Sequence, residues 1–180
     1  MPEIEIRPLI ASDIAILTGI NLSYTSTHVW QMERISEEGI AGAHFREVRL
    51  PREARVEYPR PASQIFEEPQ NPGQLILAAV IAGRPIGYVH ISTLVAPRTA
   101  WVKDWAVQDV FRRKGVGAAL LLASLEWSLE ENCRRIVVEM QSKNYPAIKL
   151  VRKLGFEYAG YHDQYYFNQD IAVFFARSLR

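Results

Sequence analysis

The stretch of residues 100–125, AWVKDWAVQDVFRRKGVGAALLLASL, determines how the rest of this 180-residue chain is arranged. It begins as a strand, passes through a basic turn that contains two glycines, and ends as an amphipathic helix. A strand that leads into a helix through such a turn leaves several backbone N–H groups unpaired at the positive end of the helix dipole. The stretch therefore predicts an anion site, suited to phosphate, at the turn.

Size and composition predict a single globular domain over residues 1–180. Hydrophobic residues make up 48% of the chain and charged residues 23%, which argues against a disordered or fibrous protein. The 21 Lys and Arg residues nearly balance the 20 Asp and Glu residues. We therefore expect no nucleic-acid partner, and any anion binding should be local.

The use of cysteine and histidine indicates no metal site. Cys133 is the only cysteine, which excludes an intrachain disulfide and a cysteine-based metal cluster. The four histidines lack the spacing of zinc ligands. The amino terminus has no basic segment followed by an apolar one, and no apolar run approaches the roughly 18 residues that span a bilayer. We therefore expect a cytoplasmic protein that does not bind a membrane.

The elements around the central stretch predict a mixed α/β sheet. Two apolar runs, 75–81 and 86–94, flank a turn with Gly83 and indicate a β-hairpin that leads into the central stretch. After the basic turn, leucines recur at helical spacing and should form one buried stripe: Leu121, Leu122, Leu125 and Leu129. The apolar run 136–140 then completes a βαβ unit whose two strands should be parallel. We further expect strands at 4–8, 43–58, 156–161, 165–168 and 171–176, helices that begin near Ser12 or Asp13 and near Asn144, and a loop over 59–73.

The basic turn has the residues of a diphosphate site. The run Arg112-Arg113-Lys114-Gly115-Val116-Gly117 places three positive charges beside two glycines that let the backbone approach an oxygen closely. A P-loop is excluded because Ala118 and Ala119 stand where it needs a hydroxyl residue to hold magnesium. A dinucleotide-binding turn is disfavoured because Leu120 stands where its third glycine or alanine belongs.

Two blocks in register resemble a known enzyme family. The stretch WAVQDVFRRKGVGAALL resembles motif A of the GNAT family of N-acetyltransferases, and the segment from Asn144 to the Leu154-Gly155-Phe156 run is similar to its motif B. The resemblance covers residues 100–160. It implies a GNAT-type fold, with a mixed, mostly antiparallel central sheet and a parallel βαβ unit splayed to admit CoA.

The resemblance also implies a site for acetyl-CoA as co-substrate. The pyrophosphate would be held by the backbone amides of the turn, and the backbone of the preceding strand would pair with the pantetheine arm as an added strand. The side chain of Asn144 would bond to the same arm. The implied residues of the turn are Arg112, Arg113, Lys114, Gly115, Val116, Gly117 and Ala118, and those of the strand are Trp105, Ala106 and Val107.

The implied reaction is direct acetyl transfer to a primary amine in a ternary complex. A carboxylate must first deprotonate the ammonium, and Asp104 and Glu139 are the candidates, although each could instead be a structural or substrate-orienting acid. Many family members carry a tyrosine as the acid that protonates the thiolate, but Val151 stands at that position. Its substitutes would be Tyr145, Tyr161, Tyr165 or water.

A weaker resemblance concerns the acceptor. The segments Tyr24-Thr25-Ser26-Thr27 to Trp30 and Gly160-Tyr161 to Phe175 look like the streptothricin acetyltransferase branch, so Tyr24 and Trp30 are candidates for binding a cationic acceptor. The acceptor could be an aminoglycoside-like or streptothricin-like amine or a lysine side chain. Two alternatives stay open: a protein acetyltransferase for ribosomal or N-terminal substrates, and an acyl-CoA-binding sensor without turnover. A homodimer is also left open.

Overall fold

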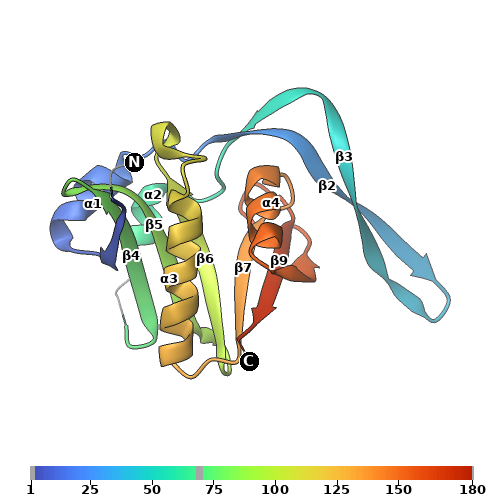
Figure 1. Cartoon of the computed structure of the whole chain (residues 1–180). Coiled ribbons are helices and arrows are strands. Elements are labelled where there is room, and N and C mark those ends of the chain that lie inside the picture. Colours follow the sequence, from blue (N-terminus) through green and yellow to red (C-terminus); the bar gives the residue numbers. More distant parts are fainter. Residues whose placement is uncertain (1–2, 68–70, 180) are drawn as a thin grey trace.

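The computed structural model describes residues 3–67 and 71–179 (Figure 1). Within these residues, seven strands form one sheet in the order β1-β4-β5-β6-β7-β9-β8, and β2 and β3 form a separate hairpin. The strands are β1 (Glu5–Pro8), β2 (Tyr24–Glu37), β3 (Ile40–Val56), β4 (Gln74–Ile81), β5 (Arg84–Ala96), β6 (Thr99–Val107), β7 (Arg135–Gln141), β8 (Glu157–His162) and β9 (Ala172–Ser178). The helices are α1 (Ala11–Thr18), α2 (Ala62–Glu67), α3 (Val116–Glu130) and α4 (Tyr145–Lys153), with one 3-10 turn, η1 (Asp109–Phe111).

The sheet has the predicted mixed topology. The pair β6 and β7 is parallel, and the other neighbouring strands of the large sheet are antiparallel. Helix α3 connects the parallel pair, so the βαβ unit is confirmed, and β4 and β5 confirm the predicted hairpin. Residues from α3 and α4 pack into one hydrophobic cluster, and residues from α1 and α2 pack into a second one.

Helix α3 buries a different stripe from the predicted one. Leu121 and Leu125 are buried as expected, but Leu122 is 46% exposed and Leu129 is 51% exposed. Two serines, Ser124 and Ser128, lie in the buried face instead. Their hydroxyl groups donate to the carbonyl groups four residues earlier, at 2.8 and 2.6 Å, so they can be buried without unpaired donors.

Several other expectations change in the structure. The proline-rich stretch 59–73, expected as a loop, contains the short helix α2, and the expected strand 165–168 consists of turn and irregular backbone. Asp13 lies in the first turn of α1 as its third residue rather than as its N-cap, and its carboxylate accepts the N–H of Ile10 at 3.1 Å. In the described residues, no helix is both long and apolar enough to span a membrane.

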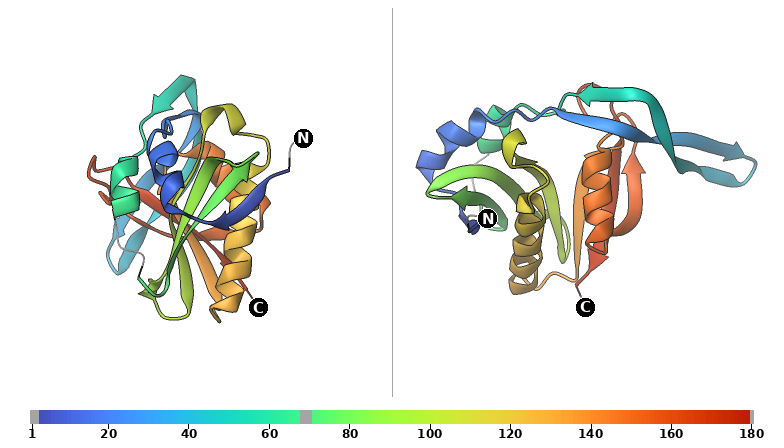
Figure 2. Two further views of the ribbon diagram at one scale, coloured as in Figure 1. Left: turned by 90° about the vertical axis from the view of Figure 1, so that its left-hand side faces the viewer. Right: turned by 45° about the horizontal axis from the view of Figure 1, so that its top comes forward.

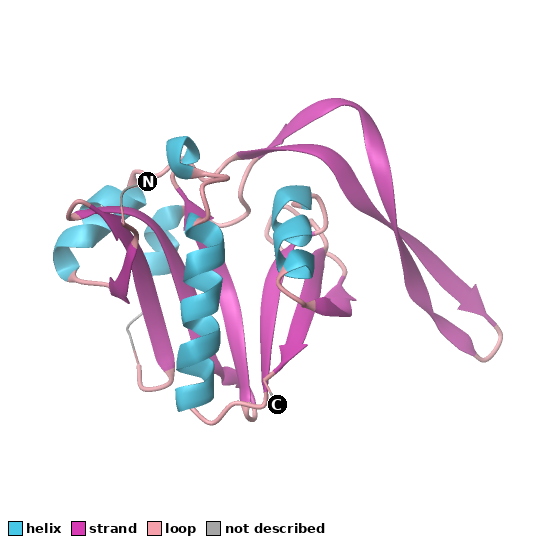
Figure 3. Cartoon of the chain, viewed as in Figure 1, coloured by secondary structure: helices cyan, strands magenta, loops and turns pink. Residues whose placement is uncertain are grey.

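The β2–β3 hairpin reaches well beyond the sheet. Figures 1 and 2 show it leaving the body beside α4, and Figure 3 shows that its outer part consists of these two strands and their turn alone. Its middle part is anchored: Trp30 N–H donates to the carbonyl of Ser142 at 2.9 Å, and the Trp30 ring packs against Phe45, Tyr158 and Phe175. Arg34 forms an ion pair with Asp163.

Candidate functional site

The strands β6 and β7 part in the middle of the sheet. Their pairing runs from Thr99 opposite Arg135 to Val102 opposite Val138, and no further pair is formed in the described residues. Against β5, the register of β6 shifts so that His90 faces Asp104 while Ile91 faces Val102, which leaves Lys103 as the extra residue of a β-bulge. A bulge bends its strand and increases the local twist. The two ribbons accordingly diverge above the paired part (Figure 1), which confirms the predicted splay.

The divergence leaves an open strand edge. Residues 104–107 of β6 still pair with β5 on one side, but their other side has no partner strand within the described part of the chain. An extended molecule can add to such an edge through backbone hydrogen bonds. Trp105, Ala106 and Val107 all belong to this open part of β6.

The turn that follows keeps a row of backbone donors. No amide of residues 113–118 donates to another backbone group among the described residues. Arg113 and Gly115 have positive φ angles, 62° and 86°, and Gly115 is the N-cap of α3. Residues that pass through this left-handed region turn successive N–H groups toward one point, which forms an anion-binding concavity. The geometry suits the predicted phosphate site.

Arg112 makes contacts within the protein that the sequence does not predict. Its N–H donates to the carbonyl of Asp109 at 3.1 Å and is therefore already used inside η1. Its guanidinium donates to the carbonyls of Val107, Ser23 and Asn21 at 2.8, 2.7 and 2.6 Å. Burial lowers the pKa of this guanidinium. Arg112 thus fastens the turn to β6 and to the segment after α1.

Gly117 is required by the packing of α3 on β6. A Cβ at this position would lie 3.1 Å from Cζ2 of Trp105 and 3.5 Å from Cδ2 of Leu150. The indole of Trp105 therefore lies against the start of α3, beside the splay. Its Nε1 is buried without a hydrogen-bond partner in the described residues.

Asn144 begins α4 at the same side of the splay. Its Oδ1 accepts the N–H of Ala147 at 3.2 Å, so the side chain is the N-cap of the helix. The cap uses only the oxygen of the amide, so the Nδ2 group remains available as a donor to a ligand. The predicted contact with the arm of CoA therefore stays a prediction, and the capping role is new.

The two candidate bases meet on the opposite face of the sheet, bridged by an arginine. Arg60 donates through Nη1 to Asp104 Oδ1 at 3.1 Å and through Nη2 to Glu139 Oε1 at 2.5 Å. Tyr58 also donates to Asp104 Oδ1, at 2.7 Å, and Trp101 donates to Glu139 Oε2 at 2.7 Å. Both carboxylates are buried.

Tyrosines complete this cluster. The hydroxyl group of Tyr165 donates to Glu139 Oε2 at 3.0 Å, and the ring of Tyr166 lies 5.3 Å from the Arg60 guanidinium carbon. Burial and the neighbouring Glu139 raise the pKa of Tyr165 to about 12. Burial also raises the pKa values of Tyr58 and Tyr166. These phenols are therefore protonated donors at neutral pH.

Sequence reasoning missed Arg60. It lies between Pro59 and Pro61 in the irregular segment that follows β3, and no motif marks it. Its partners are 44 and 79 residues away along the chain, so only the fold brings them together.

The predicted acceptor residues lie apart from each other. The Tyr24 hydroxyl group donates to Oε1 of the buried Gln141 at 2.7 Å, and Gln141 is two residues from Glu139 on the same face of β7. Tyr24 therefore borders the carboxylate cluster. Trp30 anchors the hairpin on β8 and β9 instead.

The three tyrosines proposed in place of Val151 also differ in position. Val151 is fully buried in the core, as a hydrophobic residue of α4 should be. Tyr145 donates to Glu47 of the hairpin at 3.0 Å, and the ring of Tyr161 packs on Phe45. Tyr165 reaches the carboxylate cluster through Glu139.

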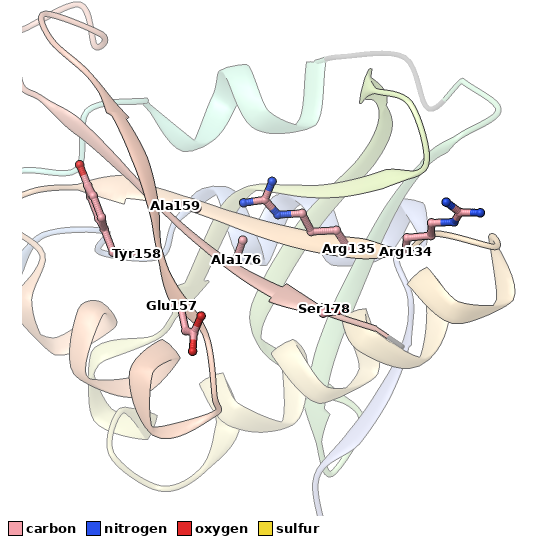
Figure 4. Close-up of a pocket in the computed structure, with 7 residues that line it drawn as sticks. All are labelled: Arg134, Arg135, Glu157, Tyr158, Ala159, Ala176 and Ser178. Atoms are coloured by element: carbon pink, nitrogen blue, oxygen red, sulfur yellow. The ribbon is translucent and has the colours of Figure 1, made fainter. Parts of the chain in front are cut away.

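A separate hollow of about 390 Å³ lies on another part of the sheet. Figure 4 shows Arg134 and Arg135 toward one end of it and Tyr158 toward the other. Because Arg135 pairs with Thr99 at the start of β6, this hollow is at the end of the sheet remote from the basic turn.

Comparisons with known proteins agree with this geometry. The model of the acetyltransferase (GNAT) family matches residues 44–156. An N-alpha-acetyltransferase of Sulfolobus acidocaldarius is 32% identical over 120 residues, which are 59% of this chain and 70% of that protein. An L-amino acid N-acetyltransferase of Escherichia coli is 30% identical over 118 residues, 61% of this chain and 71% of that protein.

Solved structures share the whole fold. A nourseothricin acetyltransferase superposes with a TM-score of 0.81 at 21% identity and covers 98% of this chain and 99% of its own. A putative streptothricin acetyltransferase from Bacillus anthracis, solved in complex with acetyl coenzyme A, has a TM-score of 0.76 at 20% identity, with coverage of 98% and 99%. Together with the match to the family model, the splayed βαβ unit and its glycine turn place the chain in a known enzyme class: it belongs to the GNAT family of acetyltransferases.

Proposed function

We propose that the protein transfers the acetyl group of acetyl-CoA to the primary amine of a cationic small molecule or lysine-like side chain, by direct attack in a ternary complex. The carrying observation is the splay between β6 and β7. It has an open strand edge and a donor-rich turn on one side, and two buried carboxylates, Asp104 and Glu139, on the other. A donor and an acceptor could therefore meet through the splay from opposite faces.

In this proposal, the amides of residues 113–118 hold the pyrophosphate of acetyl-CoA. The free edge of Trp105, Ala106 and Val107 holds the pantetheine arm, with a further bond from Asn144 Nδ2. The co-substrate supplies an activated thioester. The protein's contribution is to fix that thioester at the splay and to bring the amine to it, which turns a bimolecular encounter into a positioned reaction.

The proton steps fall to the carboxylate face. The amine nitrogen attacks the thioester carbon, the carbon–sulfur bond breaks, and the leaving thiolate takes up a proton. Asp104 or Glu139 would remove the proton of the ammonium, directly or through water. Tyr165 is the proposed donor of the proton that the thiolate takes up, because among the three candidate tyrosines it is the one bonded to this cluster.

Two observations bear on the acceptor. The carboxylates and the surrounding aromatic rings suit a cationic amine, since an ammonium is attracted to both. The nourseothricin and streptothricin acetyltransferase structures share the fold over nearly the full chain, which is compatible with a small-molecule acceptor. The N-alpha-acetyltransferase relatives support a second candidate, the N-terminal amine of a protein.

A thiol-release assay tests the proposal. Purified protein with acetyl-CoA is given a panel of small cationic amines, free amino acids, lysine peptides and N-terminal peptides, and the products are identified by mass spectrometry. We expect CoA release and an acetylated product with a cationic amine. Acetyl-CoA binding without release above the hydrolysis background for any amine would favour a sensor, and a product only with N-terminal peptides would favour the second candidate.

A further inference from the structure

Arg60 lies where the two central strands separate. Pairing between β6 and β7 ends at Val102 and Val138, and the guanidinium bonds just beyond, to the carbonyl of Lys103 at 3.0 Å and to Asp104 on one strand and Glu139 on the other. It therefore spans the splay on the carboxylate face, opposite the basic turn. An acceptor amine that approaches the thioester from this face meets the guanidinium first.

We propose that Arg60 is a specificity-determining residue that occupies the cation subsite of the acceptor and leaves it when a cationic acceptor binds. This inference rests on the proposed function and deepens it, because it assigns the acceptor subsite to named groups. The subsite consists of Asp104, Glu139 and the aromatic side chains of Trp101, Tyr165 and Tyr166.

The chemistry of the subsite is that of a cation receptor. Two buried carboxylates face one guanidinium, so removal of Arg60 would leave both acids without their shared cation. Buried acids strongly favour a replacement cation because an unpaired buried charge is costly. The rings of Tyr165 and Tyr166 lie 6.0 and 5.3 Å from the guanidinium carbon, within the range of cation–π attraction.

A second, independent observation points to a ligand here. The hydroxyl group of Tyr88 is fully buried and has no hydrogen-bond partner in the described residues. It is near enough to Asp104 for the charge of that carboxylate to raise the pKa of Tyr88, in addition to the larger effect of burial. A buried hydroxyl without a partner is costly, so an unsatisfied donor lies close to one of the two carboxylates of the subsite.

Arg60 can leave without unfolding its surroundings. Its side chain is 24% exposed, whereas those of Asp104 and Glu139 are 4% and 1% exposed. It belongs to the irregular segment between β3 and α2, and a proline on each side restricts its backbone. Release therefore needs a rotation of the side chain toward solvent and no movement of the sheet.

The alternative is that Arg60 is a fixed support for the two acids. Both roles predict that a variant at this position changes activity, so activity alone does not separate them. The two roles predict different effects when a free guanidinium ion is added to a variant that lacks the Arg60 side chain. It competes with the acceptor if Arg60 occupies the acceptor's place, and it restores activity if Arg60 is a support.

The experiment uses Arg60→Met, which keeps a long apolar stem without charge, and Arg60→Lys, which keeps a cation. Arg55→Ala is the matched control, because Arg55 is 66% exposed and its ion pair is a surface one, with Glu57 at 3.7 Å. Methylguanidinium and cadaverine are the probes. Binding is measured by calorimetry and by the tryptophan fluorescence of the protein, to which Trp101 contributes, and inhibition is measured in the thiol-release assay.

We expect Arg60→Met to bind methylguanidinium at least about tenfold more tightly than the wild type, which corresponds to roughly 1.4 kcal/mol. Arg60→Lys should bind methylguanidinium no more tightly than the wild type does, because its ammonium still supplies a cation to the two acids. Arg55→Ala should behave like the wild type. In Arg60→Met, methylguanidinium should inhibit competitively against the amine and not against acetyl-CoA. Activation by methylguanidinium, or no binding by an Arg60→Met variant that unfolds at the wild-type temperature, would overturn the proposal.

Failure of the two proposals can be told apart. If wild-type protein releases no CoA with any amine, the proposed function fails. The binding comparison does not need turnover and still decides whether a cation subsite exists beneath Arg60. If turnover occurs and methylguanidinium activates Arg60→Met, the proposed function stands and the subsite proposal is wrong.

Discussion

Asp13 is the residue on which the start of α1 depends. Its carboxylate accepts the N–H of Ile10 and two bonds from Arg7, at 2.7 and 3.0 Å. The hydrogen bond from Arg7 is the main reason that the pKa of this carboxyl group is lowered. A lowered pKa in the folded state stabilises the fold above the unfolded value near 4, and the stabilisation is lost as the pH falls through the folded value.

We therefore expect Asp13→Asn to lower the free energy of unfolding by about 2 kcal/mol at pH 7, because a charged, part-buried hydrogen bond is lost. The difference from the wild type should begin to shrink below about pH 4, where the carboxyl group of the unfolded chain becomes protonated, and it should be lost once the pH passes the lowered pKa of the folded state. Urea denaturation across this pH range measures it. The control is Glu33→Gln, whose ion pair with Arg46 is exposed and should contribute less than about 1 kcal/mol. A difference that does not depend on pH would contradict this account.

Asn144 caps α4 and is also the proposed donor to the arm of acetyl-CoA, and substitution can separate the two roles. Asn144→Ala removes both the cap of α4 and the amide donor, so it should lower the free energy of unfolding by about 1 kcal/mol and weaken acetyl-CoA binding. Asn144→Ser keeps a capping oxygen but no amide, so it should be near wild-type stability and bind acetyl-CoA as weakly as the alanine variant. Denaturation and calorimetry on the same samples measure the two effects. Wild-type affinity in Asn144→Ser would exclude the bond to the arm.

Individual residues also show which parts of the candidate site can be predicted from the sequence and which cannot. Asp104, Glu139 and the turn at 113–118 could be proposed as candidates from the sequence, because each lies within a short pattern or at a fixed spacing from one. Arg60 could not be found, because its role depends on two partners in distant strands. The double use of Asn144, as a cap and as a candidate donor, requires knowledge of where α4 begins.

At the scale of elements, the two glycines of the turn serve different physical needs. Gly115 has a φ of 86°, and a Cβ there would meet no atom within 4 Å, so backbone conformation alone requires glycine at this position. Gly117 lies inside α3, where a Cβ would meet the Trp105 ring. The sequence predicts that both are needed but offers the same reason for each.

A double-mutant comparison distinguishes these needs. Gly115→Ala and Gly117→Ala should each lower the free energy of unfolding by about 1 kcal/mol or more, the first through backbone strain and the second through overpacking. Adding Trp105→Phe removes the ring atoms nearest Gly117, so it should partly restore Gly117→Ala and leave Gly115→Ala unchanged. Urea denaturation of the wild type, the single variants and the double variants measures the coupling. Equal coupling of Trp105 to both glycines would show that the close contact is not the cause.

Element boundaries show why some predictions were right and others wrong. The strands β4, β5 and β7 have continuous apolar runs, since most of their residues are buried, and such runs are easy to recognise. The β2–β3 hairpin is exposed over much of its length, so it lacks the alternation of a half-buried strand, and only its second strand was anticipated. The predicted buried stripe of α3 differs from the observed one because Ser124 and Ser128 are polar by sequence but lie in the buried face.

At the scale of the whole molecule, the stability of the β2–β3 hairpin depends on its contacts with the rest of the fold. An isolated two-stranded hairpin is at best marginally stable in water, so β2 and β3 need support from the rest of the fold. Trp30 supplies that support through Phe45, Tyr158 and Phe175 and lies beneath the guanidinium of Arg152. At the turn of the hairpin, by contrast, Ile40 is 56% exposed.

We propose, accordingly, that residues 1–180 unfold as one domain in which Trp30 ties the hairpin to the sheet. Trp30→Ala should lower the free energy of unfolding by roughly 3 kcal/mol, because a large ring is lost from a packed cluster, whereas Ile40→Ser should change it by less than about 0.5 kcal/mol. Urea denaturation followed by both tryptophan fluorescence and circular dichroism measures this. The two signals should change together, since the cluster joins β2, β3, β8 and β9 into one cooperative unit. Separate transitions in the wild type would show that the hairpin folds independently, and equal effects of the two substitutions would show that Trp30 is not its anchor.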